Sequence, residues 1–548
     1  MKNAMLGALQ RRVLPSTRFS VWIRAAAPVP RSHAKACARR STALKRRSVI
    51  SSCLGALQRR ALPSTGLSLW ILLTAAAPAL AQAPDRSKPP MLGPPPALRL
   101  PAITPYRLSN GLQVLVLEKH EVPLVQINIV IKAGSAMDPQ GKSGLASMTA
   151  GMLDEGAGGR DALALADAVD FLGADLSVMP EQHATTIAIQ APVTRLDSLL
   201  SILADVALRP TFPAAELERQ RRQRLTALAQ QHDEARIVAQ ALFARTLFGE
   251  GHPYGRRTGG VEQSLRSFTV DDLRGFYRTY FRPGNAALVV VGDVSARAIL
   301  PRLEAAFGGA RWEAATVPAQ QWPDVAQVKA RAVYLVDKPD AAQSEVIIGR
   351  VGVPRSSADY YALVVMNTIL GASFSSRLNQ NLREEKGYTY GAASSFGFDR
   401  LAGPFAARAA VHTQVTDKAL TEFFKELTNI RTPVPAAELA RAKNFVALRF
   451  PERFQAVAQI ARQLGDLVVY DLPLDYYNTF TQRILAVTAA DVQRVARQYV
   501  DPEHVIVVVV GDKAKIEAGV RALNLGPVRT LSIDEVLGPV PAVEGAGH

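Results

Sequence analysis

A stretch of this chain occurs twice, and the repetition restricts the fold more than any other feature of the sequence. Residues 268–293 align without a gap on residues 487–512. The identical pairs are Thr269 and Thr488, Asp272 and Asp491, Arg278 and Arg497, Tyr280 and Tyr499, Pro283 and Pro502, Val289 and Val508, Val290 and Val509, Val291 and Val510, Gly292 and Gly511, and Asp293 and Asp512. A duplicated domain is the simplest explanation of such a repeat.

Each copy has the pattern of a helix followed by a buried strand. Thr269 and Thr488 stand where an N-cap residue begins a helix, and a turn with proline follows the helical stretch. The runs at 288–291 and 505–510 are too apolar for a strand with one face in water. We therefore expect a central strand in each domain.

Other segments indicate that each domain combines a sheet with helices. Both halves open with strand patterns, and a helical stretch covers residues 214–231. The expected strands are Leu112–Leu117, Val125–Ile131, Ala332–Val336 and Glu345–Gly349. The predicted fold class is α+β, with two domains that each place helices on a sheet.

Positive charge is concentrated in the first 81 residues, which carry 14 Lys or Arg and no Asp or Glu. The formal net charge of +16 therefore leaves 16 − 14 = +2 for residues 82–548. This nearly neutral remainder argues against binding to nucleic acid or to a membrane surface.

The basic leader contains the pattern of a secretory signal peptide. Arg59 and Arg60 precede an apolar run at residues 66–77, which is too short for a convincing membrane span. We expect cleavage after Ala81 and a periplasmic protein. Both cysteines, Cys37 and Cys53, precede this cut, which excludes thiol catalysis and cysteine metal ligation in the mature chain.

The chain is expected to divide into six segments. Residues 54–65 nearly repeat residues 6–17, which suggests that translation starts near Val49, with Met1 as the alternative. The prolines after the leader favour an extended tether. The expected segments are a leader at 1–81, a tether at 82–102, a first domain at 103–309, a linker at 310–328, a second domain at 329–525 and a tail at 526–548.

Two segments resemble the M16 peptidases, the family of insulinase, pitrilysin and the mitochondrial processing peptidase. One is Gly144-Leu-Ala-Ser-Met-Thr-Ala-Gly-Met-Leu153, and the other runs from Gly371 to Ala392 and includes Leu382-Arg-Glu-Glu-Lys-Gly-Tyr-Thr-Tyr390. With the repeated Val-Gly-Asp strands, the resemblance covers most of residues 103–525. It implies two homologous domains that face one another, each with a mixed, largely antiparallel sheet covered by helices.

In catalytic members of that family, an inverted H-x-x-E-H motif on a helix supplies two zinc ligands and a general base, and a glutamate on a later helix is the third ligand. The residues aligned with these positions are Ser147, Ala150, Gly151 and, on the later helix, Ala227 beside Thr226. These side chains cannot form a zinc site of histidine and glutamate. The resemblance therefore implies no metal in this chain and a zinc ion in a partner subunit.

The second segment matches the part of the family that binds substrate. By this resemblance, Arg383 and Tyr390 correspond to a catalytic, substrate-binding arginine and tyrosine, and Tyr388, expected on the same strand face, is a competing candidate. Gly387 is expected to end a helix before a strand at 388–392, so the pair would lie at a helix–strand junction. The alternative is that Arg383 forms a surface ion pair and Tyr390 packs in a sheet.

Together these features suggest one half of an enzyme. We hypothesise a non-metal-binding subunit of a periplasmic M16 zinc peptidase, in which a zinc-bearing homologue is the partner and peptides are the substrate. The alternative is a non-catalytic scaffold or binding protein with the same fold. In neither case is the chain alone expected to hydrolyse peptides.

Overall fold

The computed structural model describes residues 99–542. The leader lies outside these residues, together with Cys37, Cys53, the expected start near Val49 and the expected cut after Ala81. Most of the tether and the last residues of the tail lie outside them as well.

The first half of the described chain forms a six-stranded sheet with the order β1–β2–β8–β3–β7–β6. β2 and β8 are parallel, and the other neighbours are antiparallel. The strands are β1 (Thr104–Arg107), β2 (Gln113–Glu118), β3 (Leu124–Ile131), β6 (Asp175–Pro180), β7 (Thr185–Pro192) and β8 (Ala286–Gly292). The helices are α2 (Leu145–Gly151), α3 (Ala162–Phe171), α4 (Leu196–Leu208), α5 (Ala214–Gln231), α6 (Ala235–Phe248), α7 (Glu262–Ser267), α8 (Val270–Tyr280) and α9 (Ala296–Phe307).

The second half forms another six-stranded sheet with the order β11–β12–β10–β13–β9–β14. β9 is parallel to both of its neighbours, and the remaining pairs are antiparallel. The strands are β9 (Ala332–Asp337), β10 (Gln343–Val351), β11 (Thr389–Phe398), β12 (Ala402–His412), β13 (Ile506–Gly511) and β14 (Val528–Leu531). The helical elements are α10 (Tyr360–Leu370), α11 (Arg377–Asn379), η6 (Gln380–Glu385), α12 (Thr416–Asn429), α13 (Ala436–Arg449), α14 (Val457–Val469), α15 (Phe480–Ala486), α16 (Ala489–Tyr499), α17 (Lys513–Ala522) and α18 (Ile533–Leu537).

The two sheets confirm the predicted duplication and the α+β class with mixed, largely antiparallel sheets. Strands β2, β8, β3, β7 and β6 occupy the same places in the first sheet as β9, β13, β10, β12 and β11 in the second. The repeated caps also agree: the hydroxyls of Thr269 and Thr488 each accept the backbone N–H three residues later, at 3.1 Å. All predicted strands are present, and the helix predicted at 214–231 is α5.

The second sheet continues beyond residue 525, where the sequence suggested a tail. β14 pairs with β9 at its edge, and α18 follows directly. Between Trp312 and β9, residues 313–331 form neither helix nor strand. Within residues 99–542, no helix combines the length and the hydropathy that a membrane span requires.

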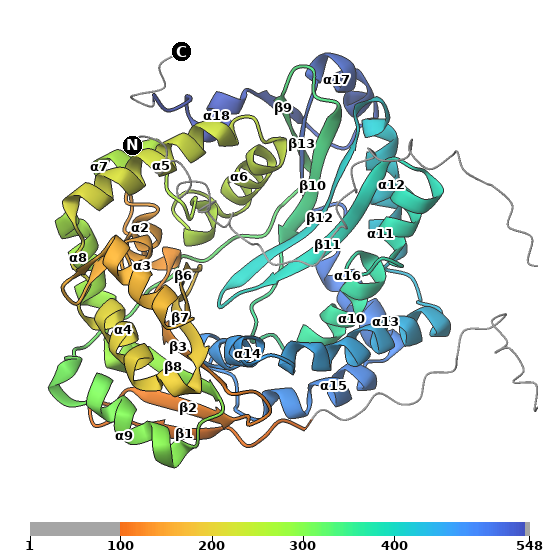
Figure 1. Cartoon of the computed structure of the whole chain (residues 1–548). Coiled ribbons are helices and arrows are strands. Elements are labelled where there is room, and N and C mark those ends of the chain that lie inside the picture. Colours follow the sequence, from red (N-terminus) through yellow and green to blue (C-terminus); the bar gives the residue numbers. More distant parts are fainter. Residues whose placement is uncertain (1–98, 543–548) are drawn as a thin grey trace, which may run out of the picture. The chain divides into compact units, whose positions relative to one another are not determined.

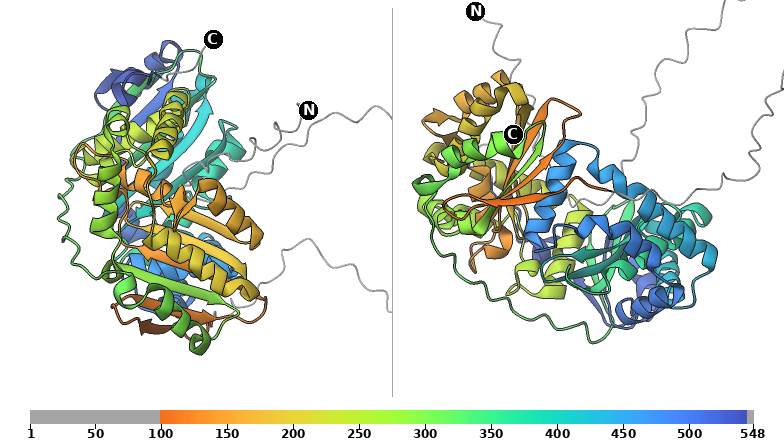
Figure 2. Two further views of the ribbon diagram at one scale, coloured as in Figure 1. Left: turned by 60° about the vertical axis from the view of Figure 1, so that its left-hand side comes forward. Right: turned by 90° about the horizontal axis from the view of Figure 1, so that it is seen from below.

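The valine-rich central strands are buried on both faces because the two halves exchange a helix. In β13, Val507 and Val509 belong to a core built mainly by the second half, whereas Val508 and Val510 pack in a cluster with α6 from the first half. In the first sheet, α14 from the second half packs against β3 and β8. Figures 1 and 2 show α6 beside the second sheet and α14 beside the first.

This exchange explains why the repeated strands lack an alternation of polar and apolar residues. Side chains along a strand point alternately to the two faces of the sheet, so a polar residue would be buried on either face. β8 and β13 are buried at every position. Separating the halves would therefore expose one valine-rich face on each sheet.

A buried histidine lies beside a polar contact that joins the halves. His183 lies in the turn between β6 and β7, and its Nε2 is hydrogen-bonded to the hydroxyl of Tyr254. The same hydroxyl accepts the backbone N–H of Leu401, in the turn between β11 and β12, at 3.1 Å. Burial, followed by the charge of Arg400 and the proximity of His252, lowers the pKa of His183 to about 4.

We predict that His183 makes the fold less stable at mildly acidic pH. The folded protein keeps the ring neutral, whereas the unfolded chain takes up a proton near the usual value of 6.5. The free energy of unfolding should therefore decrease as pH falls from about 6.5 towards about 4, by at most about 3 kcal/mol, because one pKa unit corresponds to about 1.4 kcal/mol. His183→Gln should remove this part of the pH dependence in urea unfolding, and parallel curves for the two proteins would contradict the prediction.

Candidate functional site

The substrate-binding segment predicted in the second half is a short helical stretch, α11 and η6, followed by β11. Leu378 and Leu382 are fully buried and fix one side of this stretch in the core. Arg377 donates to both carboxylate oxygens of Glu438 on α13, at 2.8 and 2.6 Å. The amide of Asn381 donates to two glutamates of α12, each at 2.8 Å. The buried side of the stretch is thus tied to two helices.

Arg383 lies on the exposed side of the same stretch. The backbone there is π-helical, with the N–H of Lys386 donating to the carbonyl of Asn381 at 3.0 Å. Insertions of this kind are rare and are frequent at functional sites. The guanidinium lies 4.8 Å from the ring centre of exposed Phe374, and Nε lies 3.2 Å from a carboxylate oxygen of Glu384. The predicted surface ion pair is therefore present, but it joins Arg383 only to its exposed neighbour.

Gly387 ends the helical stretch as the sequence predicted. Its φ is +65°, a conformation that favours glycine. Its N–H donates to the carbonyl of Arg383 at 3.1 Å, and the N–H of Tyr388 donates to the carbonyl of Leu382 at 2.8 Å. These bonds turn the chain directly into β11.

Tyr390 is brought to the surface by a β-bulge. Thr389 pairs with Val411 and Ala392 with Ala409, so two residues, Tyr390 and Gly391, stand opposite one on β12. The hydroxyl of Thr389 holds the bulge by accepting the N–H of Gly391 at 3.1 Å. The Tyr390 side chain is 83% exposed. It does not pack within the sheet, as the alternative interpretation expected.

Tyr388 lies one residue before the start of β11 and is less exposed than Tyr390. The strand begins at Thr389, one residue later than predicted, and the bulge interrupts the alternation that a regular strand would have. Tyr388 is half-buried against the core of the second half. Of the two candidates, Tyr390 is therefore the more accessible one.

The degenerate zinc motif lies on α2, where it meets α5. Leu145, Met148 and Met152 belong to the core of the first half, as expected for the buried stripe of the helix. Ser147 and Gly151, the two positions aligned with zinc-binding histidines, approach Arg224 of α5. Ala150 is buried, and Ala227 is half-buried one turn after Arg224.

These residues do not fit a zinc ion. The hydroxyl of Ser147 already accepts a hydrogen bond from Arg224 at 2.9 Å, and the carbonyl of the same residue accepts a second at 2.8 Å. Across residues 99–542, no group of three or more His, Cys, Asp or Glu side chains is placed to hold a metal. Arg224 was not among the predicted site residues. Its position three residues before Ala227, on the same side of a helix, is the signal that could have identified it.

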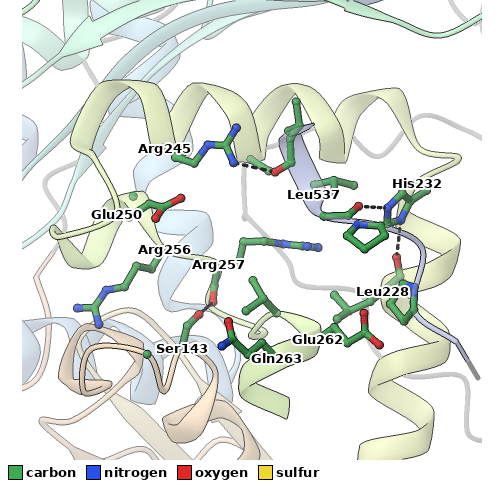
Figure 3. A pocket seen from close by; sticks show the side chains of 18 of the residues that line it. Ser143, Leu228, His232, Arg245, Glu250, Arg256, Arg257, Glu262, Gln263 and Leu537 are labelled. Atoms are coloured by element: carbon green, nitrogen blue, oxygen red, sulfur yellow. Dashed lines mark hydrogen bonds between the residues drawn. The ribbon is translucent and has the colours of Figure 1, made fainter. Parts of the chain in front are cut away.

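A cavity of about 600 Å³ lies outside both segments. α5, α6, the loop before α7 and the residues around α18 line it, as Figure 3 shows. Arg245 donates to the carbonyls of Glu535 and Val536, at 2.9 and 3.1 Å, and Nε2 of His232 lies 2.8 Å from the carbonyl of Gly538. These bonds hold the C-terminal segment against the first half.

Two family models match successive parts of the chain. The model described as "Insulinase (Peptidase family M16)" matches residues 113–257 and includes α2 and α5. The model described as "Peptidase M16 inactive domain" matches residues 267–446 and includes Arg383 and Tyr390.

Relatives and solved structures agree with these matches. An uncharacterized zinc protease of Streptomyces coelicolor is 25% identical over 285 residues, which is 52% of this chain and 62% of that protein. A probable mitochondrial-processing peptidase subunit beta of Arabidopsis thaliana is 22% identical, over 74% of this chain and 77% of the relative. A peptidase M16 inactive domain from Pseudomonas fluorescens superimposes with a TM-score of 0.70 at 26% identity, over 75% of this chain and 98% of that structure. With the duplicated sheets and both family matches, these likenesses establish that the chain belongs to the M16 peptidase family.

Proposed function

We propose that this protein is the non-metal-binding subunit of a periplasmic M16 zinc peptidase. A homologous, zinc-bearing partner would supply the metal, and this chain would supply Arg383 and Tyr390 to bind the peptide. The periplasmic location rests on the leader pattern that ends at Ala81. The names of the relatives, which include zinc proteases and a processing peptidase subunit, support proteolysis as the context.

The exposed, irregular junction between η6 and β11 is the observation that carries this proposal. Buried leucines and ion-paired or hydrogen-bonded side chains stabilise the rest of the segment. Tyr390, by contrast, presents most of its surface to solvent, and Arg383 makes its only ion pair among residues 99–542 with adjacent Glu384. A π-helical turn and a β-bulge, retained where neither side chain supports the core, are typical of a binding site.

The chemistry of the two side chains suits peptide hydrolysis. A tyrosine hydroxyl can donate to the carbonyl oxygen of the scissile peptide as negative charge develops on it, and loss of one such donor costs about 3 kcal/mol in the transition state. A guanidinium can hold a backbone carbonyl or a carboxylate of the substrate through two parallel hydrogen bonds. Stacking on Phe374 would restrict the guanidinium before substrate binds.

We predict that the purified chain holds no stoichiometric zinc and does not cleave peptides, because the α2–α5 positions lack ligands. Mixing it with a secreted homologue that carries H-x-x-E-H should produce peptidase activity that exceeds the sum of the separate subunits. Zinc analysis measures the metal content, size-exclusion chromatography detects the complex, and cleavage of a quenched fluorescent peptide library measures the activity. Turnover by the lone chain would contradict the proposal, and a mixture that forms no complex would favour the scaffold alternative.

Within that complex, Tyr390→Phe should lower kcat/KM by roughly 100-fold, since it removes one donor to the developing oxyanion. Arg383→Ala should raise KM, and Arg383→Lys should recover only part of the loss, because lysine lacks the planar pair of donors. Tyr388→Phe is the matched control and should leave activity unchanged, since that residue packs against the core. Equal activity of all four variants in an intact complex would exclude this role for the pair.

A further inference from the structure

A single side chain bridges the two helices on which catalytic relatives place their zinc ligands. Arg224 extends from α5 to α2, where Nη1 donates to the hydroxyl of Ser147 at 2.9 Å and Nη2 donates to its carbonyl at 2.8 Å. Both bonds reach the first histidine position of the degenerate motif. The guanidinium thereby links α2 and α5 without a metal.

The second histidine position faces the same guanidinium. A β-carbon at Gly151 would lie 2.9 Å from Nη2 of Arg224, closer than such an atom can approach without a shift. Gly151 and Ser147 are four residues apart on α2, so they lie on one face of the helix. Glycine at 151 leaves the room that the guanidinium occupies.

The charge of Arg224 remains at this place in the folded protein. None of the ion pairs among residues 99–542 includes it, so no carboxylate neutralises it. Burial lowers the pKa of Arg224 to about 10, which still leaves the group protonated at neutral pH. A fixed positive charge within hydrogen-bonding distance of both helices repels a divalent cation.

We propose that the guanidinium of Arg224 takes the place of the catalytic metal, both joining α2 to α5 as the metal would and closing this site to zinc. The loss of metal binding thus involves more than missing ligands. Of the aligned positions, Ser147 accepts both hydrogen bonds of Arg224, and Gly151 leaves room for its guanidinium.

Zinc loading of grafted chains tests the exclusion. One full-length variant carries Ser147→His, Ala150→Glu, Gly151→His and Ala227→Glu with Arg224 kept, and a second carries the same changes with Arg224→Ala. After incubation with zinc chloride and gel filtration, the first should retain little zinc and the second close to stoichiometric zinc. Equal loading of the two proteins, whether full or absent, would show that Arg224 does not control access and would overturn the exclusion.

Thermal unfolding of the otherwise unaltered chain tests the link between the helices. Arg224→Met keeps an unbranched side chain but removes both hydrogen bonds, and it should lower Tm by at least about 3 °C. Arg222→Met, at an exposed position two residues earlier on α5, is the matched control and should change Tm little. Equal shifts would overturn the link, and if Arg224→Met does not fold, Arg224→Lys with its single ammonium group should show the same ranking.

This inference does not depend on the proposed peptidase partnership. The readouts are zinc content and Tm of the lone chain, whereas the proposed function is measured as activity of a complex. If Tyr390→Phe did not lower the activity of the complex, the Arg224 result would be unchanged. Likewise, a failed Arg224 test would leave the proposed function untouched.

Discussion

The exchange of α6 and α14 between the two halves is the packing constraint on which the rest of the structure depends. Each central sheet has two apolar faces, and on each sheet one of these faces is covered by a helix from the other half. Burial of valine side chains is worth about 1.5–3 kcal/mol each, so the strands β8 and β13 strongly favour the exchanged arrangement. The duplicated domains are therefore parts of one packed unit.

The exchanged helices also connect the two chemically distinctive segments to that unit. α5, which carries Arg224, ends three residues before α6 begins. α13, whose Glu438 anchors Arg377 beside the Arg383 segment, precedes α14 by a short 3₁₀ turn. Each segment is thus attached at one end to a helix that is fixed against the opposite sheet.

The halves share a strand order, but Arg224 of the first half is bonded inside the fold, whereas Arg383 of the second half lies at the surface. In the first half, Arg224 of α5 donates two hydrogen bonds to Ser147 of α2, and its guanidinium lies against Gly151. In the second half, Arg383 rests on an exposed ring, and Tyr390 projects from a bulge into solvent. The guanidinium of Arg224 stabilises the fold because its hydrogen bonds are made within it. The exposed guanidinium of Arg383 is available to a substrate or partner.

Local sequence was sufficient for much of this fold, whereas the candidate residues were identified by the resemblance to the M16 family. The repeat, the threonine caps and the uninterrupted valine runs predicted two copies of a capped helix followed by a central strand, because capping and strand burial depend on residues near each other in the chain. The glycine at position 387 correctly indicated the end of a helical stretch. Other features arose only from contacts between distant segments: α6 and α14 cover the opposite sheets, a bulge opposite β12 includes Tyr390, and Arg224 reaches Ser147 across 77 positions of the chain. Pairing register and long side-chain contacts are set by packing in three dimensions, and for that reason only the tertiary structure decided them.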